Sequence, residues 1–278
     1  MKIRIAHSPD SDDAFMFYAL TAGKIDTGGL EIEHVLADIE TLNREALKGT
    51  YEVSALSFHA YPYVADKYLV LPSGGSVGDG YGPIVVSKEG LRSLKGIRIG
   101  VPGRLTTAYL VLKLYEPDFE EVVMPFDRVL DAVKEGTVDA GLVIHEGQLS
   151  YQDKGLVKVL DLGEWWKKET NLPLPLGCNI IRKDLGMELI RKFERLMRES
   201  VEYALSHREE ALSFAKEYAR DIKEDEERTK RFVSMYVNER TLDYKEDGRR
   251  AVRLLLEMGI SKGIIKASMP KVIFSDEV

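Results

Sequence analysis

The sequence predicts an α/β protein of two lobes that is completed by a helical segment at its C-terminal end. Short apolar runs alternate with amphipathic stretches through the first 181 residues, a rhythm typical of βαβ units and a mainly parallel sheet. A second series of strand and helix patterns begins near Gly96, and beyond Asp184 only long helical patterns remain. We therefore expect one lobe, then the other, with the helical tail packing on the first.

The first series predicts strands joined by helices and a glycine-rich loop. Strand patterns cover residues 2–6, 30–36, 53–56, 68–71 and 84–87. A helix over 12–22 takes Ser11 as its expected N-cap, and a helix over 39–48 is expected to end at Gly49.

The second series and the tail are read in the same way. Strands are expected at 97–101, 121–124, 138–144, 156–160 and 178–181, the last after the helix-breaking segment 173–177. Helices are expected at 105–114, 127–135, shortly after 144, around Trp165 and Trp166, and at 186–205, 208–220, 226–236 and 245–257. The charge run 221–228 is interpreted as a solvated helix start, and the two indoles as packing residues.

The predicted domain organisation follows from this order. Residues 1–90 form lobe one, 91–181 form lobe two, and 182–278 return to lobe one. The chain then crosses between lobes near 87–95 and again near 175–184, which makes a hinge. The cleft between the lobes is the expected ligand site.

Composition excludes several classes of protein. The 278-residue chain is 44% hydrophobic and carries a net charge of −7, which fits a soluble globular protein and argues against nucleic-acid binding. The N-terminus shows no signal-peptide pattern and no apolar run is long enough to span a membrane, so we expect a cytoplasmic protein without a membrane partner. The single cysteine, Cys178, excludes an intrachain disulfide and is interpreted as a core residue rather than a nucleophile.

His145 closes an apolar run and is the leading candidate for chemistry. Residues 141–144 have the pattern of a buried strand, and His145 lies where that strand should end, before the polar stretch 146–152. Ligands of open α/β sheets bind beyond the carboxyl ends of strands, where an imidazole can exchange a proton near neutral pH. Structural histidines also occur at strand ends, so position alone leaves both roles open.

Hydroxyl groups follow two other strands. Ser54 and Ser57 flank the end of one strand, where they can receive a ligand carboxylate, and Ser57 can also cap the next helix. Thr106 and Thr107 follow a turn at Gly103 and precede a helix. Their hydroxyls and the free N–H groups of the first turn predict a neutral anion pocket, although capping alone explains them equally well.

The remaining motifs argue against a metal or a cofactor. Asp10, Asp12 and Asp13 open the first helix but lack the glycine and distal glutamate of an EF-hand loop, so capping and loop shaping are favoured. The glycine-rich loop 73–82 matches neither nucleotide-binding pattern and is followed by a strand, so we interpret it as a mobile or close-packed loop beside the hinge. No zinc-ligand spacing and no Gly-x-Ser-x-Gly motif is present.

Five segments in this order resemble one enzyme family. They are SPDSDDAF, SGGSVGDGYGP, VPGRLTTAYLVLKLY, AGLVIHEGQLSY and LPLPLGCNIIRKDL. Together they resemble the 1,4-dihydroxy-6-naphthoate synthases of the futalosine route to menaquinone, over residues 3–260, and TTAYL and IHEGQ are the most specific parts. The resemblance implies a fold of the periplasmic-binding-protein type II class.

The resemblance also implies a reaction and its residues. The family cleaves cyclic dehypoxanthine futalosine to 1,4-dihydroxy-6-naphthoate and dihydroxyacetone, without a cofactor or metal. By this resemblance His145 is the catalytic base, and Ala55, Leu56 and Ser57 hold the substrate together with Thr107 and Ala108. The base must be a neutral imidazole, so we expect that Glu146 does not hold it as imidazolium.

Two other functions remain open at this point. Chorismate dehydratase shares the fold and the pathway, although IHEGQ favours the synthase. A non-catalytic protein that binds small acids is the other alternative, because this fold serves many binding proteins. His7 and His59 lie in possible cleft loops and are candidates to assist or replace His145. The sequence does not fix the role of the three aspartates or the oligomeric state.

Overall fold

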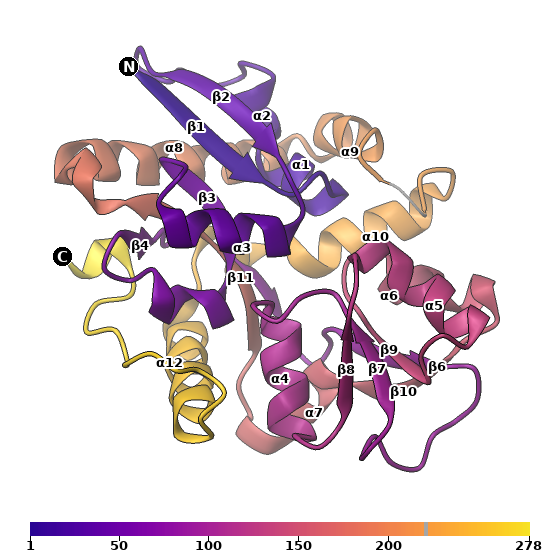
Figure 1. Cartoon of the computed structure of the whole chain (residues 1–278). Helices are drawn as coiled ribbons and strands as arrows, with labels where there is room; N and C mark the ends of the chain where they lie inside the picture. Colours follow the sequence, from indigo (N-terminus) through magenta and orange to yellow (C-terminus); the bar gives the residue numbers. More distant parts are fainter. Residues whose placement is uncertain (220–221) are drawn as a thin grey trace.

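In the computed structural model, which describes residues 1–219 and 222–278, the chain forms two β-sheets with helices on their faces (Figure 1). The first sheet has the strand order β2–β1–β3–β11–β4, and β5 also pairs with β11. Its strands are β1 (Lys2–His7), β2 (Glu31–Leu36), β3 (Val53–Ser57), β4 (Tyr68–Val70), β5 (Ser76–Gly78) and β11 (Leu174–Arg182). β1 is parallel to β2 and β3, whereas β11 is antiparallel to β3, β4 and β5.

The second sheet has the strand order β10–β6–β9–β7–β8. Its strands are β6 (Ile84–Ser87), β7 (Arg98–Val101), β8 (Glu120–Val123), β9 (Ala140–Val143) and β10 (Val157–Asp161). β7 is parallel to β8 and β9, whereas β6 is antiparallel to β9 and β10.

Both sheets are mixed, so the expectation of mainly parallel sheets is wrong. The antiparallel strands β6 and β11 are the ones that the chain makes just after it crosses between the sheets. Ile84 at the start of β6 pairs with Val143 at the end of β9, and Gly177 early in β11 pairs with Ser57 at the end of β3. A strand that arrives from the other lobe enters its sheet at the cleft, and so runs against strands that end there.

The strands are divided between the sheets differently from the ranges expected for the lobes. β6 falls within the range 1–90 but lies in the second sheet, and most of β11 falls within 91–181 but lies in the first. The crossings are therefore at 79–83 and at 162–173, each several residues earlier than expected. The apolar runs of β6 and β11 do not show which sheet each strand joins, because buried strands of either sheet look alike.

Helices cover both sheets, and most of them lie close to the expected positions. They are α1 (Ser11–Met16), α2 (Tyr18–Thr21), α3 (Ile39–Lys48), α4 (Thr107–Tyr115), α5 (Val129–Glu135), α6 (Gly147–Ser150), α7 (Leu162–Thr170), α8 (Met187–Ser206), α9 (Arg208–Lys216), α10 (Glu226–Tyr236), α11 (Glu239–Leu242) and α12 (Lys245–Ser261). As expected, α3 ends at Gly49, whose φ of 74° suits glycine. Two expected boundaries lie outside the described residues. They are residue 220, where the helix 208–220 should end, and residue 221, where the charge run 221–228 begins.

Three local expectations need correction. The helix expected at 12–22 is broken at Phe17 into α1 and α2, and its N-cap is Asp10 rather than Ser11. Ser11 is already the first residue of α1, and its hydroxyl donates to Glu146 of the other lobe. Pro175 lies inside β11, where the register shifts, so the strand begins before Cys178.

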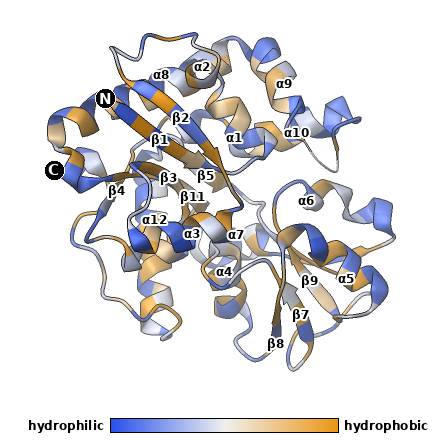
Figure 2. Cartoon of the chain, turned by 45° about the horizontal axis from the view of Figure 1, so that its top comes forward, coloured by the Kyte–Doolittle hydropathy of each residue, from blue (hydrophilic) through white to orange (hydrophobic). Residues whose placement is uncertain are grey.

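The tail packs on the first sheet, as expected. α8 and α9 join α1 and α2 over a core that contains Ile5, Phe15, Phe193 and Met197. α12 packs on β11 and also contacts α4, so one apolar core continues from the first sheet into the second. The strands of the first sheet are largely hydrophobic between helices of mixed character (Figure 2).

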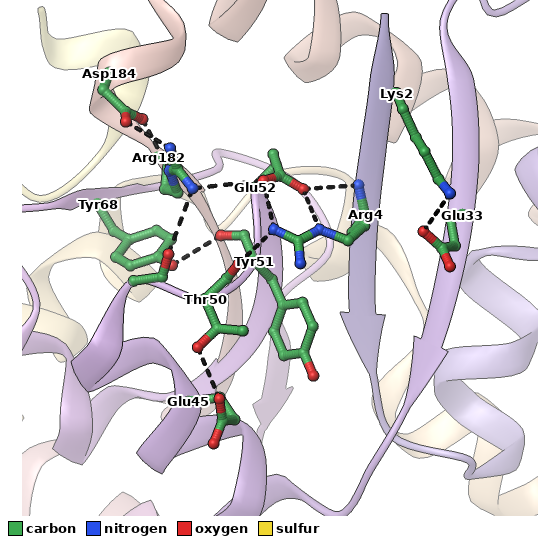
Figure 3. A network of polar contacts seen from close by, with 11 residues as sticks. Lys2, Arg4, Glu33, Glu45, Thr50, Tyr51, Glu52, Tyr68, Arg182 and Asp184 are labelled. Carbon is green, nitrogen blue, oxygen red and sulfur yellow. Dashed lines mark hydrogen bonds and ion pairs between the residues drawn. The ribbon is translucent and has the colours of Figure 1, made fainter.

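A network of charged side chains fastens the end of the first sheet that lies far from the cleft (Figure 3). Glu52 accepts hydrogen bonds from the guanidinium of Arg4 at 2.8 Å and from Arg182 at 3.4 Å, and Arg182 also pairs with Asp184. The network thus joins β1, the start of β3 and the end of β11. Its hydrogen bonds with Arg4 lower the pKa of Glu52 from its ordinary value.

We expect Glu52→Ala to lower the free energy of unfolding by about 2 kcal/mol, because two arginines lose a charged acceptor. Since the folded-state pKa of Glu52 is lowered, its contribution is present at neutral pH and is lost as the pH falls through that pKa. Urea unfolding of both proteins at neutral and acidic pH measures this. Glu33→Ala is the control, since its pair with Lys2 is exposed; an equal loss in both variants would contradict the prediction.

Candidate functional site

A cavity lies between the two sheets, at the cleft-facing ends of their strands. The six residues that the family resemblance implies for the site all lie on its wall: Ala55, Leu56, Ser57, Thr107, Ala108 and His145. Ser54, the other expected hydroxyl, is not among the lining residues, and it donates to the carbonyl of Ala55. The other lining residues are Ser8, Asp12, Asp13, Ile39, Gly74, Ser76, Pro83, Thr106, Ile144, Gln148, Leu176, Gly177, Cys178, Asn179, Phe232 and Tyr236.

His145 stands at the end of β9 in an uncommon backbone conformation. Its φ of 57° lies in the left-handed region, where few residues other than glycine occur, although histidine is enriched among them. The ring packs edge-on against Phe126 at 4.8 Å, and Nδ1 lies 2.9 Å from Oδ2 of Asp10. Since Asp10 belongs to the first lobe, the imidazole is held from across the cleft.

The neighbouring residues make a second contact across the cleft. Ser11 donates a hydrogen bond of 2.8 Å to the buried carboxylate of Glu146. We expected that Glu146 does not hold His145 as imidazolium, and this remains a prediction. A carboxylate that does contact the imidazole is that of Asp10. Sequence reasoning missed this partner because Asp10 is remote in the chain and was interpreted as a capping residue.

Ser57 occupies the end of β3 and is fixed from α3. Its hydroxyl accepts a hydrogen bond from the amide of Asn43 at 3.0 Å, and its backbone N–H donates to the same side chain at 2.8 Å. The side chain of Ser57 does not cap the 3-10 helix Phe58–Tyr63 that follows. The hydroxyl is therefore held at the cavity wall by a neutral partner.

The start of α4 forms the facing part of the wall. Thr106 is the N-cap, and its hydroxyl accepts from the N–H of Tyr109. The N–H groups of Thr107 and Ala108 precede that bond and have no acceptor within the helix. Thr107 donates its own hydroxyl to the carbonyl of Leu176 at 2.6 Å, which ties α4 to β11. Thr106 therefore caps α4, and the same helix start offers the N–H groups of Thr107 and Ala108 to an anion.

Two further aspartates lie on the wall beside the imidazole. Burial raises the pKa of Asp13 to about 6, although the N–H of Ser8 donates to its carboxylate at 2.8 Å. Burial and the neighbouring carboxylates of Asp13 and Asp10 raise the pKa of Asp12 well above its ordinary value. Both shifts favour the neutral carboxyl, so in mildly acidic solution the wall carries less negative charge than two ordinary aspartates would give it.

The other candidate histidines serve the packing. His7 stacks on Phe17 and contacts His34, and burial lowers its pKa to about 4. His59 is buried against the carbonyl of Thr106 at 3.2 Å and stacks near Tyr109, and burial lowers its pKa to about 4. Both lie behind the wall that His145 reaches.

The tail and β11 contribute wall residues that sequence reasoning missed. Tyr236 of α10 donates to the amide oxygen of Gln148, which joins the tail to the second lobe. Among the residues that the structure describes, the buried oxygens Asp12 Oδ1 and Asn179 Oδ1 are acceptors on the wall without a hydrogen-bond partner in the protein. The amphipathic pattern of α10 places Tyr236 on a buried face without showing that this face reaches the cleft.

Two other kinds of feature are absent from the described residues. Within 1–219 and 222–278, no group of three or more His, Cys, Asp and Glu side chains is arranged to hold a metal ion. No helix in this part of the chain is long and apolar enough to cross a membrane.

Comparison with known proteins identifies the family. A family model described as menaquinone biosynthesis matches residues 3–260. The chain belongs to this family. It is 44% identical over 272 residues to a 1,4-dihydroxy-6-naphtoate synthase from Thermus thermophilus, which covers 98% of both chains. It is 38% identical over 274 residues to a protein of the same name from Streptomyces coelicolor, which covers 96% of both.

Solved structures confirm the predicted fold of this menaquinone biosynthesis family member. The crystal structure of a protein from Archaeoglobus fulgidus matches with a TM-score of 0.92 and 56% identity, over 95% of this chain and 98% of that one. An alkanesulfonate-binding protein from Xanthomonas axonopodis matches with a TM-score of 0.71 and 12% identity, over 95% and 94%. The second likeness concerns the fold alone, which is of the periplasmic-binding-protein type.

We expect Cys178 to be unreactive in the folded protein, although it lies on the cavity wall. Its thiol is buried against the carbonyl of Leu56, and burial raises its pKa far above the ordinary value, so little thiolate forms. When the native protein is mixed with a chromogenic disulfide reagent at mildly alkaline pH, absorbance should show no release of the coloured thiol. Release should begin only when guanidinium unfolds the chain. Rapid labelling of the native protein would contradict the interpretation of Cys178 as a core residue.

Proposed function

We propose that this protein is a 1,4-dihydroxy-6-naphthoate synthase, a carbon–carbon lyase that cleaves cyclic dehypoxanthine futalosine to 1,4-dihydroxy-6-naphthoate and dihydroxyacetone. The observation that carries this proposal is His145, placed at a strand end on the wall of the cavity between the lobes. Two relatives that match nearly the whole chain bear the synthase name. The matching family model is described as menaquinone biosynthesis, the route to which the family resemblance assigns this product.

In this proposal His145 is the general base. Its imidazole removes a proton from the substrate, and a carbon–carbon bond then breaks in the retro-aldol sense. The electron pair moves into the bicyclic ring system, which becomes aromatic, and the proton returns to the departing three-carbon fragment. The aromatic ring formed in this step makes the cleavage favourable, so an acid–base group is the only chemical group that the protein must supply.

The carboxylate of the substrate would bind between Ser57 and the start of α4. The hydroxyl of Ser57 and the N–H groups of Thr107 and Ala108 are neutral donors at facing parts of the wall. Donors at a helix N-terminus stabilise an anion, and their neutrality keeps the desolvation penalty of binding small. Leu176 and Phe232 supply apolar surface for the ring system.

The hydroxyl groups of the substrate would bind elsewhere on the wall. Asp12 Oδ1 and Asn179 Oδ1 are buried acceptors whose partners the protein does not supply within the described residues. Buried polar atoms are nearly always hydrogen-bonded, so a ligand rich in hydroxyls suits them better than an apolar one. Lobe closure would then exclude water and bring the base to the substrate.

Incubation of the purified protein with cyclic dehypoxanthine futalosine tests the proposal. We expect 1,4-dihydroxy-6-naphthoate and dihydroxyacetone to form in equal amounts. The naphthoate is measured by its fluorescence, and mass spectrometry identifies the product. Chorismate is offered in parallel. Dehydration of chorismate, or tight binding of a small acid without turnover, would replace the proposed function with one of the two alternatives.

We expect His145→Ala to lower kcat by about 10³-fold with a much smaller change in KM, because the proton acceptor is lost. His59→Ala is the comparison, since His59 is buried behind the wall. Steady-state kinetics and thermal unfolding separate a loss of chemistry from a loss of folded protein. A folded His145→Ala protein with unchanged kcat would move the base to another residue.

We expect Ser57→Ala to raise KM by about 10-fold while kcat changes little, because a hydrogen bond to a charged group stabilises substrate and transition state alike. Ser213→Ala is the matched control on the exposed surface of α9. The Kd for 2-naphthoate, measured by calorimetry, should rise in parallel in Ser57→Ala alone. An unchanged KM would remove Ser57 from the carboxylate site.

A further inference from the structure

Two consecutive residues of the first lobe contact two consecutive residues of the second. Asp10 Oδ2 lies 2.9 Å from Nδ1 of His145, and the hydroxyl of Ser11 lies 2.8 Å from Oε1 of Glu146. Asp10 and Ser11 open α1 after β1, whereas His145 and Glu146 follow β9 of the other sheet. The four residues therefore form one bridge across the cleft, which we call the α1–β9 bridge.

The bridge is shielded from water. The side chain of Asp10 is 3% exposed and that of His145 is 18% exposed, while Ser11 and Glu146 are buried. A hydrogen bond that involves a carboxylate is stronger in such surroundings than at the surface, because solvent screens it less. The contact with Asp10 therefore has the strength to fix the orientation of the ring.

We propose that Asp10 is a positioning residue, which holds the proton of His145 on Nδ1 and so directs Nε2 to the substrate. This inference rests on the proposed function in one respect, the role of His145 as base. A carboxylate accepts only, so Nδ1 must be the donor, and in the neutral ring the lone pair is then on Nε2. Because the partners belong to different lobes, the base is fully oriented only when the lobes meet.

Asp10 would also act during the reaction. Once Nε2 takes a proton the ring is an imidazolium, and the carboxylate beside Nδ1 stabilises that charge. Asp12 and Asp13 of α1 and Glu146 are the other acidic groups around this end of the cleft. Burial raises the pKa of both aspartates of α1, so they carry less negative charge than ordinary aspartates as the pH falls below neutral.

Kinetics of Asp10→Asn and Asp10→Ala test the inference. We expect kcat to fall by about 10²-fold with a smaller change in KM. The lower midpoint of the pH profile of kcat should move to more acidic pH, because removal of a nearby negative charge disfavours the imidazolium. Ser11→Ala should raise KM through weaker closure and leave the midpoint unchanged. Asp66→Asn, on an exposed loop, is the matched control and should behave as the wild type.

A spectroscopic measurement separates this inference from the proposed function, since it needs no turnover. The chain has five histidines, so ¹⁵N-labelled histidine gives few signals, and the loss of one set in His145→Asn assigns those of His145. We expect the neutral ring of the wild type to carry its proton on Nδ1, and Asp10→Ala to lose that preference. A proton on Nε2 in the wild type, or unchanged kcat and pH midpoint in both folded Asp10 variants, would overturn the role of Asp10.

Discussion

The two places where the chain crosses between the sheets touch each other backbone to backbone, and the arrangement of the lobes depends on this contact. The N–H of Leu162 in the second crossing donates to the carbonyl of Pro83 in the first at 2.9 Å. A Cβ on Gly163 would lie 2.0 Å from backbone atoms of Tyr81, so no larger residue fits there without displacing the chain. The glycine-rich loop is therefore close-packed at this point, as one of the two interpretations of its sequence expected. With both crossings pinned together, each sheet presents its strand ends to the other.

This arrangement explains why the cavity wall is assembled from segments that are far apart in the chain. Strands β1, β3 and β9 end at the cleft, and the strand ends and the helix start after β1 bring Asp12, Ser57 and His145 to one space. The lobes also contact each other beside the cavity, where Glu40 of α3 accepts from the N–H of Leu105 and where Tyr236 donates to Gln148. Below it, one apolar core runs from Val70 and Ile180 in the first sheet to Ile99 and Leu142 in the second. Polar contacts between the lobes therefore lie beside the cavity, and apolar contacts lie below it.

The sequence predicts the wall of the site better than it predicts the contacts within it. Ser57, Thr107 and His145 were recognised because each follows an apolar run or opens a helix, which are local patterns. The direction of β6 and β11 was not predicted, because the sequence of an apolar strand looks the same in either sheet and in either direction. The contact of Asp10 with His145 was also not predicted, because it joins residues on different lobes and depends on how the crossings place those lobes. Ser11 shows the same limit: its sequence position fits a helix cap, and its hydroxyl is used across the cleft instead. Local sequence patterns predict local structure, whereas contacts between residues of different lobes depend on the complete fold.

The backbone at His145 connects the fold to the chemistry. A left-handed residue two positions after the end of β9 turns the chain away from the strand, and this conformation costs about 1–2 kcal/mol for a residue with a Cβ. The N–H of Gln148 donates to the carbonyl of His145 and so stabilises the turn. Gly147 lets the turn pack closely, because a Cβ at this position would come within 2.7 Å of Val143. A relaxed backbone would carry the side chain onward in the direction of β9. The strained turn instead places the ring between Phe126 and Asp10, at the cavity. The strain is local, but the carboxylate that the ring contacts belongs to the other lobe, so the geometry of the imidazole depends on how the two lobes are placed.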